Sequence, residues 1–172
     1  PIISSNKVDI SSCLNVHYLE ASKNNNNQPI ALLLHGFPEL CFSWRKIIPI
    51  LAYEGFRVIA PDMRGYGLTS GGTKKYDTNI SEYRLLNLTT DILSLISALK
   101  INKVDLLVGH DAGSSVAGTS ALIRPDIFKS VVMMSAPFTG APNIDSNLSY
   151  QDPIHKDLKE LNPPRKHYQW YY

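Results

Sequence analysis

Residues 103–118, which read KVDLLVGHDAGSSVAG, decide the fold. Residues 104–108 form a mostly apolar, β-favouring run that is typical of a strand buried on both faces. Residues 109–113 (GHDAG) then turn sharply, and the small residues that follow favour a helix packed closely on a sheet. Small residues on both sides of one central residue, between a strand and a helix, are typical of a nucleophile elbow. Only small neighbours tolerate the strained backbone of that central residue.

The central residue of this turn is Asp111, where many elbows have serine or cysteine. A carboxylate is a poor nucleophile for acyl transfer, but it can displace a leaving group at a saturated carbon and form an ester with the substrate. A helix capped by an aspartate after a strand would give the same local pattern without catalysis. The motif alone therefore leaves both interpretations open.

The composition argues against several functional classes. The 17 basic and 15 acidic residues give a formal net charge of +2, so no nucleic-acid partner is expected. No apolar run reaches the roughly 18 residues that a membrane span needs. The two cysteines, Cys13 and Cys41, form no disulfide framework and show no metal-ligand spacing. We expect a cytoplasmic protein without a membrane span or a metal ion.

Strand-like and helix-like patterns alternate along the chain. Strand-like runs occupy residues 8–10, 14–21, 29–34, 56–60, 104–108 and 128–134, the last of which is expected to be buried. Ser43 and Ser81 are expected to cap helices, the first kinked by Pro49 and ended by Gly55, the second covering residues 82–100. The elbow helix should end near Arg124. This order predicts an α/β fold with a mostly parallel sheet, right-handed crossovers and flanking helices.

Three of the predicted strands end in distinctive turns: HGFPE at residues 35–39, PDMRGYG at 61–67 and GHDAG at 109–113. The carboxyl ends of parallel strands gather at one edge of a sheet, where α/β proteins place their chemistry. The elbow mechanism needs two backbone donors, one directly after the nucleophile and one from the first of these turns. We therefore predict an oxyanion hole made by the N–H groups of Phe37 and Ala112. Loss of one such donor costs about 2.7–4 kcal/mol of transition-state stabilisation.

With these motifs the sequence resembles the α/β-hydrolase-fold epoxide hydrolases of the soluble type. The resemblance runs from about Asn15 to Tyr172, and it includes RPDIFKSVVMMSAPF after the elbow and HYQWYY at the end. It implies the α/β-hydrolase fold. Residues 1–138 would form the N-terminal part of the core and residues 139–172 the beginning of the lid, or cap, region.

The resemblance also assigns roles to individual residues. Asp111 matches the nucleophile, and Phe37 and Ala112 match the oxyanion-hole amides. Tyr168 matches the first of two lid tyrosines that hold the epoxide oxygen, a role that suits a phenol because it can donate to the opening ring. The implied reaction opens an epoxide to a vicinal diol through an ester on Asp111, with water as the second substrate and no cofactor or metal.

Other residues are expected around that chemistry. His35, Pro38 and Trp170 should line the substrate pocket, and the Phe37–Pro38 bond should be the cis-proline turn that aims the Phe37 amide inward. His35 and His110 are expected to be structural imidazoles, and His17 to lie at the surface. The remaining two histidines lie in the lid-like segment. The base histidine, its acidic partner and the second lid tyrosine are therefore expected beyond residue 172, in which case this chain is a fragment.

Two alternatives remain open. A haloalkane or haloacid dehalogenase shares the fold, but such relatives often use an indole N–H directly after the nucleophile, where this chain has Ala112. A catalytically inactive, truncated hydrolase-fold protein is the other alternative, and the missing base favours it for this chain by itself.

Overall fold

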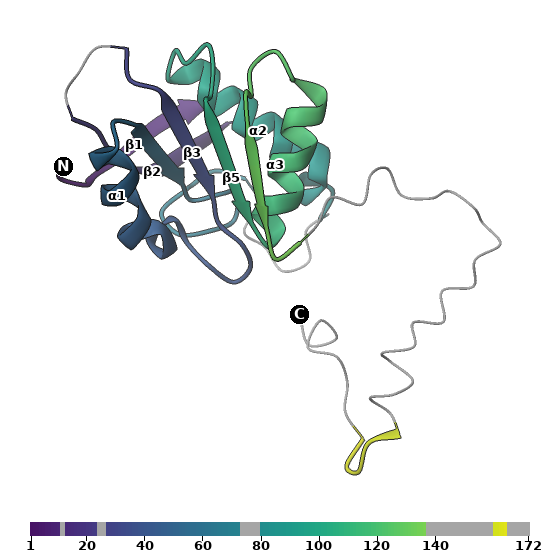
Figure 1. Ribbon diagram of the computed structural model, residues 1–172. Coiled ribbons are helices and arrows are strands. Elements are labelled where there is room, and N and C mark those ends of the chain that lie inside the picture. The colour runs from purple at the N-terminus through teal and green to yellow at the C-terminus, as the bar shows by residue number, and fades with distance from the viewer. Residues whose placement is uncertain (11–12, 24–26, 73–79, 137–159, 165–172) are drawn as a thin grey trace. The chain divides into compact units, whose positions relative to one another are not determined.

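The computed structural model describes residues 1–10, 13–23, 27–72, 80–136 and 160–164 of the 172-residue chain (Figure 1). The chain divides into two units, Pro1–Phe138 and Thr139–Tyr172. All the strands and helices named below belong to the first unit. None of the helices in the described ranges is long and apolar enough to cross a membrane.

A six-stranded sheet forms the centre of the first unit, with the strand order β1-β2-β4-β3-β5-β6 (Figure 1). Its strands are β1 (Ser4–Ile10), β2 (Leu14–Ala21), β3 (Ile30–Leu34), β4 (Arg57–Pro61), β5 (Leu106–His110) and β6 (Val131–Met134). β2 pairs antiparallel with both β1 and β4, whereas β4, β3, β5 and β6 run parallel. The mostly parallel sheet predicted from the sequence is confirmed.

Helices cover both faces of the sheet. A 3₁₀ turn, η1 (Cys41–Lys46), leads into α1 (Ile47–Tyr53); a second one, η2 (Ile80–Tyr83), precedes α2 (Leu85–Ala98); and α3 (Ala112–Ile123) follows β5. Successive strand residues point to opposite faces, so Leu32 and Leu34 of β3 pack with α2 and α3 while Ala31 and Leu33 pack with α1. Burial on both faces explains why β3 reads as an unbroken apolar run.

The two predicted serine caps are wrong. Ser43 lies inside η1, and α1 begins only at Ile47. Proline has no N–H, and a helix that started at Ser43 would need the N–H of Pro49 for its ladder. Starting at Ile47 puts Pro49 in the first turn, where no intrahelical N–H bond is required. Similarly, Ser81 belongs to η2, and Arg84, in an extended conformation, precedes α2.

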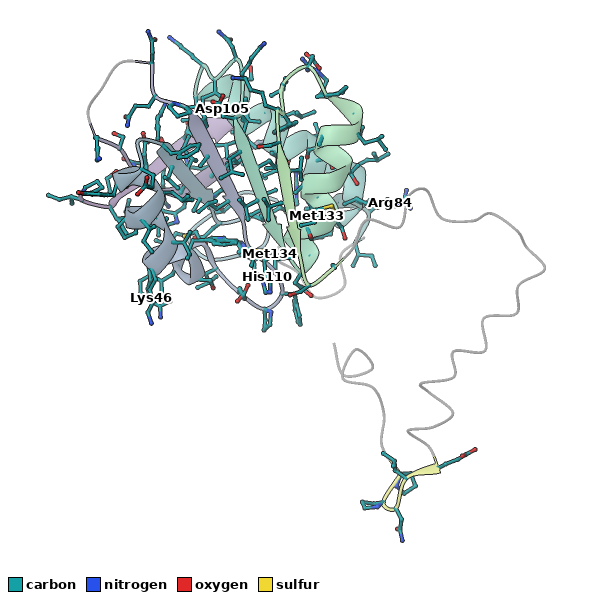
Figure 2. The ribbon with its side chains drawn as sticks, viewed as in Figure 1. Lys46, Arg84, Asp105, His110, Met133 and Met134 are labelled. Atoms are coloured by element: carbon teal, nitrogen blue, oxygen red, sulfur yellow. The ribbon has the colours of Figure 1, made fainter. Side chains whose placement is uncertain are left out.

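The last strand is shorter and more exposed than predicted. β6 begins at Val131, while Phe128 forms an isolated bridge with Val104. The expectation of a buried strand is wrong because β6 is the outermost strand of the described sheet, and Val132 and Met134 are 44% and 41% exposed. Their partners in the register belong to β5, so the carboxyl ends of β5 and β6 lie together, with His110 opposite Met134 (Figure 2).

Candidate active site

Asp111 occupies the turn between β5 and α3. Its backbone has φ 51° and ψ −118°, a conformation that L-residues other than glycine rarely adopt. The turn is held on both sides, since the Asp111 N–H donates to the carbonyl of Met134 and the Ser114 N–H donates to the carbonyl of Asp111. A strained residue costs on the order of 1–3 kcal/mol and persists only where the surrounding structure fixes it.

Close backbone packing explains the small residues around this turn. A Cβ atom added at Gly36 would lie 2.6 Å from Cβ of Asp111 and 2.9 Å from the carbonyl oxygen of His110. One added at Gly109 would lie 2.3 Å from the carbonyl oxygen of Gly113. All three distances are shorter than any normal contact. The loop after β3 can therefore approach the elbow only with glycine at position 36, and the chain can turn tightly from β5 into α3 only with glycine at position 109.

The Phe37 amide points directly at the side chain of Asp111. Its N–H donates to Oδ1 of Asp111 over 2.9 Å, and the Phe37–Pro38 peptide bond is cis, as predicted. The N–H of Ala112, at the first position of α3, lies at the positive end of the helix dipole and also interacts with the carboxylate. Oδ1 of Asp111 thus accepts the Phe37 N–H, and the Ala112 N–H acts on the same carboxylate from the start of α3.

These donors also set the charge of Asp111. The hydrogen bond from Phe37 is the largest cause that lowers the pKa of Asp111; burial opposes it, and the Ala112 amide and the charge of His110 act in the same direction as Phe37. The net pKa lies below the ordinary aspartate value, so the side chain is an ionised carboxylate at neutral pH. Phe37, Pro38 and Ala112 are exposed, and Asp111 itself is half-buried.

His35 holds the loop that presents Phe37. It is completely buried, its Nδ1 lies 2.9 Å from the carbonyl oxygen of Gly36, and its Nε2 accepts the N–H of Met63 over 3.0 Å. These contacts define a neutral ring protonated on Nδ1. Burial lowers the pKa of His35, which keeps the ring neutral. The ring therefore joins the loops after β3 and β4, and Tyr66 packs edge-on against it, with the ring centroids 4.9 Å apart.

A second link ties the loop after β3 to the elbow. Oε2 of Glu39 lies 2.8 Å from Nδ1 of His110 and 3.3 Å from the N–H of Gly36. Burial raises the pKa of Glu39, whereas its bonds to His110 and Gly36 lower it. The lowering effects together are larger, so the net pKa is below the ordinary value for glutamate. The carboxylate of Glu39 thus connects His110, the residue before Asp111, with Gly36, the residue before Phe37.

The loop after β4 is fixed by a buried ion pair. The Arg64 guanidinium donates two hydrogen bonds of 2.7 Å to the carboxylate of Asp91 on α2, and a third contact reaches Glu82 over 3.3 Å. Sequence reasoning noted the PDMRGYG turn but missed this pairing. Asp91 is 27 residues away from Arg64 in the sequence, on a helix face whose polar residues look like an ordinary solvent-exposed surface.

The prediction that His17 lies at the surface is also wrong. Only 4% of His17 is exposed, and its Nδ1 lies 2.7 Å from Oδ2 of the buried Asp62. Together with Cys41 they form the one group of possible metal-ligating side chains found within the described residues. β2 is an interior strand, and the loop after β4 covers His17, a contact between distant segments that local patterning does not reveal.

Two predicted site residues, Tyr168 and Trp170, lie outside the described residues, as do His155 and His167. His35 and Pro38 lie on either side of Phe37 in the sequence, but they differ in exposure. His35 is buried and its ring is hydrogen-bonded to the backbone of Gly36 and Met63, whereas Pro38 is exposed. Their expected places in the wall of a substrate pocket stay predictions. The described part of the site is the nucleophile-like turn and its donors.

Comparisons with known proteins agree with this geometry. A family model described as alpha/beta hydrolase fold matches residues 29–161. The chain is 37% identical over 160 residues to epoxide hydrolase B of Mycobacterium tuberculosis, covering 91% of this chain and 43% of that protein. It is 44% identical over 110 residues to an epoxide hydrolase of Caballeronia sordidicola, covering 64% of this chain and 32% of that protein.

Solved structures give the same result. A laboratory-evolved variant of a potato epoxide hydrolase superposes with a TM-score of 0.75 and 34% identity, covering 92% of this chain and 45% of that one. An epoxide hydrolase of Vigna radiata superposes with a TM-score of 0.70 and 38% identity, covering 79% of this chain and 41% of that one. The chain thus spans less than half the length of each of these relatives.

Proposed function

Because the chain belongs to the α/β-hydrolase fold family, we propose that Asp111 is the nucleophile of an epoxide hydrolase whose N-terminal part is this chain. The observation that carries the proposal is the 2.9 Å hydrogen bond from the Phe37 N–H to Oδ1 of Asp111 at a strained strand–helix turn. Its relatives named epoxide hydrolases supply the substrate class, a small-molecule epoxide.

The first step forms an ester. The free carboxylate oxygen of Asp111 attacks one epoxide carbon, the bond from that carbon to the ring oxygen breaks, and the ring oxygen becomes an alkoxide that takes a proton. We assign that proton donation to Tyr168, and residues 139–172 to the beginning of the lid that carries it. The lowered pKa of Asp111 favours this step because only the ionised form is nucleophilic.

The second step hydrolyses the ester. Water attacks the carbonyl carbon of the Asp111 ester, and the carbonyl oxygen becomes an oxyanion before the vicinal diol leaves. Oδ1 already lies against the Phe37 donor, so this oxygen is the one that the hole would stabilise. The step needs a base to take a proton from water, and we place that base in the part of the protein beyond residue 172.

Because ester formation and ester hydrolysis need different groups, the proposal predicts how this chain behaves by itself. It should be alkylated once by a reactive aryl epoxide and then remain esterified, because a missing general base typically costs about 10²–10⁴-fold in rate. The experiment measures intact mass over time for the wild type, Asp111→Asn and Asp126→Asn. Asp126 is a matched control because it is an exposed carboxylate beyond the C-terminal end of α3, whereas the elbow turn precedes the N-terminal end of that helix.

We expect one equivalent of adduct in the wild type and in Asp126→Asn, and none in Asp111→Asn. Adduct of equal amount in all three proteins would overturn the assignment of Asp111. Continuous production of diol by the wild-type chain would overturn the proposed place of the base.

Water and a small-molecule epoxide are the partners that this proposal requires, and the chemistry uses no cofactor.

We also propose a cytoplasmic location, which the two free cysteines, Cys13 and Cys41, support because reducing compartments keep thiols unpaired. Detection of a Cys13–Cys41 disulfide in protein isolated from cells without reductant would contradict this location.

A further inference from the structure

Three side chains at the β1 side of the sheet are connected in a way that the proposed function does not use. Oγ of Ser5 lies 2.8 Å from Nε2 of His17, and Nδ1 of His17 lies 2.7 Å from Oδ2 of Asp62. Ser5 belongs to β1, His17 to β2, and Asp62 directly follows β4. The site is separate from Asp111, which follows β5, because β4 and β3 lie between β2 and β5.

The strand register brings Ser5 to His17. Lys7 of β1 is the cross-strand partner of His17, and Ser5 lies two residues earlier in β1, on the same face as Lys7. Diagonal neighbours of this kind are within reach of a long side chain such as histidine. Ser5 is exposed, whereas His17 and Asp62 are 4% and 2% exposed. The serine is therefore an exposed residue, while its two partners are buried.

The charge of Asp62 decides which nitrogen of His17 carries the proton. Burial raises the pKa of Asp62, but hydrogen bonds of 2.9 Å from the N–H groups of Leu68 and Cys41, with further bonds from the Cys41 thiol and His17, bring it below the ordinary value. An ionised carboxylate can only accept, so Nδ1 of His17 must donate to it. In the neutral imidazole, Nε2 is then the acceptor that faces the Ser5 hydroxyl.

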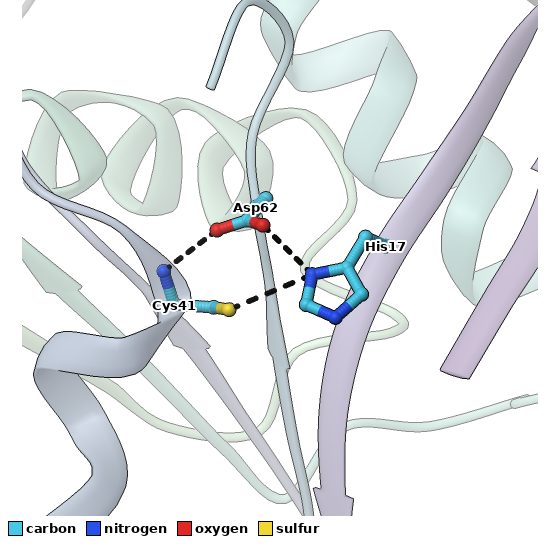
Figure 3. A group of neighbouring side chains, drawn as sticks. All are labelled: His17, Cys41 and Asp62. Carbon is cyan, nitrogen blue, oxygen red and sulfur yellow. Dashed lines mark hydrogen bonds and ion pairs between the residues drawn. The ribbon is translucent and has the colours of Figure 1, made fainter. Parts of the chain in front are cut away.

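The Thr69 hydroxyl also ties the backbone of His17 to that of Asp62. Oγ1 of Thr69 donates to the carbonyl of Asp62 over 2.6 Å and accepts the N–H of His17 over 3.0 Å. Figure 3 shows the His17 ring turned toward the Asp62 carboxylate, with the Cys41 side chain on the same side. A base held in this way loses little entropy when it acts.

The same group does not fit a metal ion. Sγ of Cys41 lies 3.8 Å from Nδ1 of His17, but burial raises the pKa of the thiol far above its ordinary value. The thiolate is the form that binds metal. Both oxygens of Asp62 already accept backbone N–H groups, and the 2.7 Å separation between His17 and Asp62 is a hydrogen-bond distance. The arrangement is that of a nucleophile, a base and an orienting acid.

We propose that Ser5 is a second nucleophile of this protein, activated by His17 and Asp62, which takes the acyl group of small activated esters. Oγ of Ser5 bonds to the carbonyl carbon of the ester while its proton passes to Nε2 of His17. The intermediate then loses the leaving alcohol, which takes the proton from Nε2, and acyl-Ser5 remains. Water restores Ser5 by the same route and releases the carboxylic acid. Lys7 adds a positive charge to this face for the developing oxyanion.

A fluorophosphonate probe tests the nucleophile directly. Ser5 Oγ bonds to phosphorus, fluoride leaves, and the hydroxyl proton passes through His17 to solvent, so the adduct is stable. Trypsin releases residues 1–7, whose only hydroxyl groups are those of Ser4 and Ser5. Ser4 provides the matched control, because it is an exposed neighbour on β1 whose Oγ donates to the carbonyl of Glu20 and accepts from the side-chain amide of Asn6, whereas Oγ of Ser5 lies against His17.

We expect labelling at Ser5 at least about 100-fold faster than in a synthetic peptide of residues 1–7, the lower end of what a positioned base contributes. Ser5→Ala should abolish the label in the folded protein, and Ser4→Ala and Asp111→Asn should keep it. His17→Gln, with its fold checked by circular dichroism, should slow labelling by a similar factor. Equal labelling of Ser4 and Ser5, or a rate no faster than that of the peptide, would overturn the proposal.

Discussion

The ionised state of Asp111 is the residue-level property on which the chemistry depends. The two backbone donors that would stabilise an oxyanion later in the reaction also hold the carboxylate ionised in the free protein. In the reaction that we propose, the same geometry would serve both steps: it would keep Asp111 charged for the attack, and it would hold Oδ1 where negative charge develops during ester hydrolysis.

A lowered pKa predicts a specific pH profile for alkylation of Asp111. The rate should stay constant from pH 8 down to the ordinary carboxyl pKa of about 3.9, and it should fall only below that value, because the folded-state pKa is lower. The measurement is the initial rate of mass increase with an aryl epoxide at each pH, after subtraction of the rate in Asp111→Asn. A half-maximal rate above pH 5 would contradict the environment described for this carboxylate.

Gly36 gives a second test at the residue scale. Gly36→Ala would place a methyl group 2.6 Å from Cβ of Asp111, so the loop must move away and the Phe37 donor must move with it. We expect alkylation to slow by about 10²-fold, as for loss of an oxyanion-hole donor. Gly55→Ala is the control. A Cβ atom added at Gly55 would meet no other atom within 4 Å, but the φ of this residue is +102°, which is strained for alanine. The substitution should therefore cost about 1 kcal/mol of stability and leave the alkylation rate unchanged.

Equal alkylation rates for Gly36→Ala and Gly55→Ala, at matched folded fractions, would contradict the close approach of the two loops. Circular dichroism and urea unfolding of both variants provide the folded fractions for that comparison.

At the scale of elements, the loops after β3, β4 and β5 are held by polar side chains that reach between them. His35 connects the first two loops, Glu39 and His110 connect the first and third, and Arg64 anchors the second to α2 through Asp91. These links fix the Phe37 amide and the elbow relative to each other, although each loop by itself is irregular. Rigid positioning of this kind is what a preformed oxyanion hole requires.

The buried Arg64–Asp91 pair should contribute strongly to the stability of this arrangement. Asp91→Ala would leave the guanidinium of Arg64 buried without its two-bond partner, which typically destabilises a protein by about 3–5 kcal/mol. Asp126→Ala removes a comparable two-bond partner from Arg124 at an exposed position, where little change is expected. Urea unfolding of the two variants and the wild type measures the difference. Equal midpoints for the two variants would contradict the structural role of the buried pair.

How much of these elements could be predicted from sequence depended on the range of the interactions. The turn at Asp111 and the buried strands β3, β4 and β5 are local patterns of apolar and small residues, and these strands begin and end within two residues of the predicted bounds. The helix starts were wrong because Pro49 and the extended Arg84 override the serine caps. The buried state of His17 could not be predicted, because its partner Asp62 is 45 residues away and meets it only through the pairing of β2 with β4.

At the scale of the whole molecule, β6 is the outer strand of the described sheet. Val132 and Met134 expose apolar surface on this strand. Such edges pair with other chains unless charged or covered. Val132→Lys places a charge on the exposed face of β6, on the side of the strand away from Val131 and Met133.

We therefore expect Val132→Lys to reduce self-association of the chain. Sedimentation velocity at increasing protein concentration should show a rising mean sedimentation coefficient for the wild type and a nearly constant one for the variant. Lys129→Ala, which changes an exposed residue just before the strand, serves as the control. Identical concentration dependence in Val132→Lys and the wild type would contradict the role of the β6 edge.

The most direct test of the central proposal is to locate the covalent adduct by peptide mass spectrometry after incubation with an aryl epoxide. We expect one equivalent on the carboxylate of Asp111, within the tryptic peptide of residues 104–129, as an ester that mild base releases as the vicinal diol. An adduct on any other side chain, or an Asp111 that stays unmodified while epoxide is consumed, would contradict it.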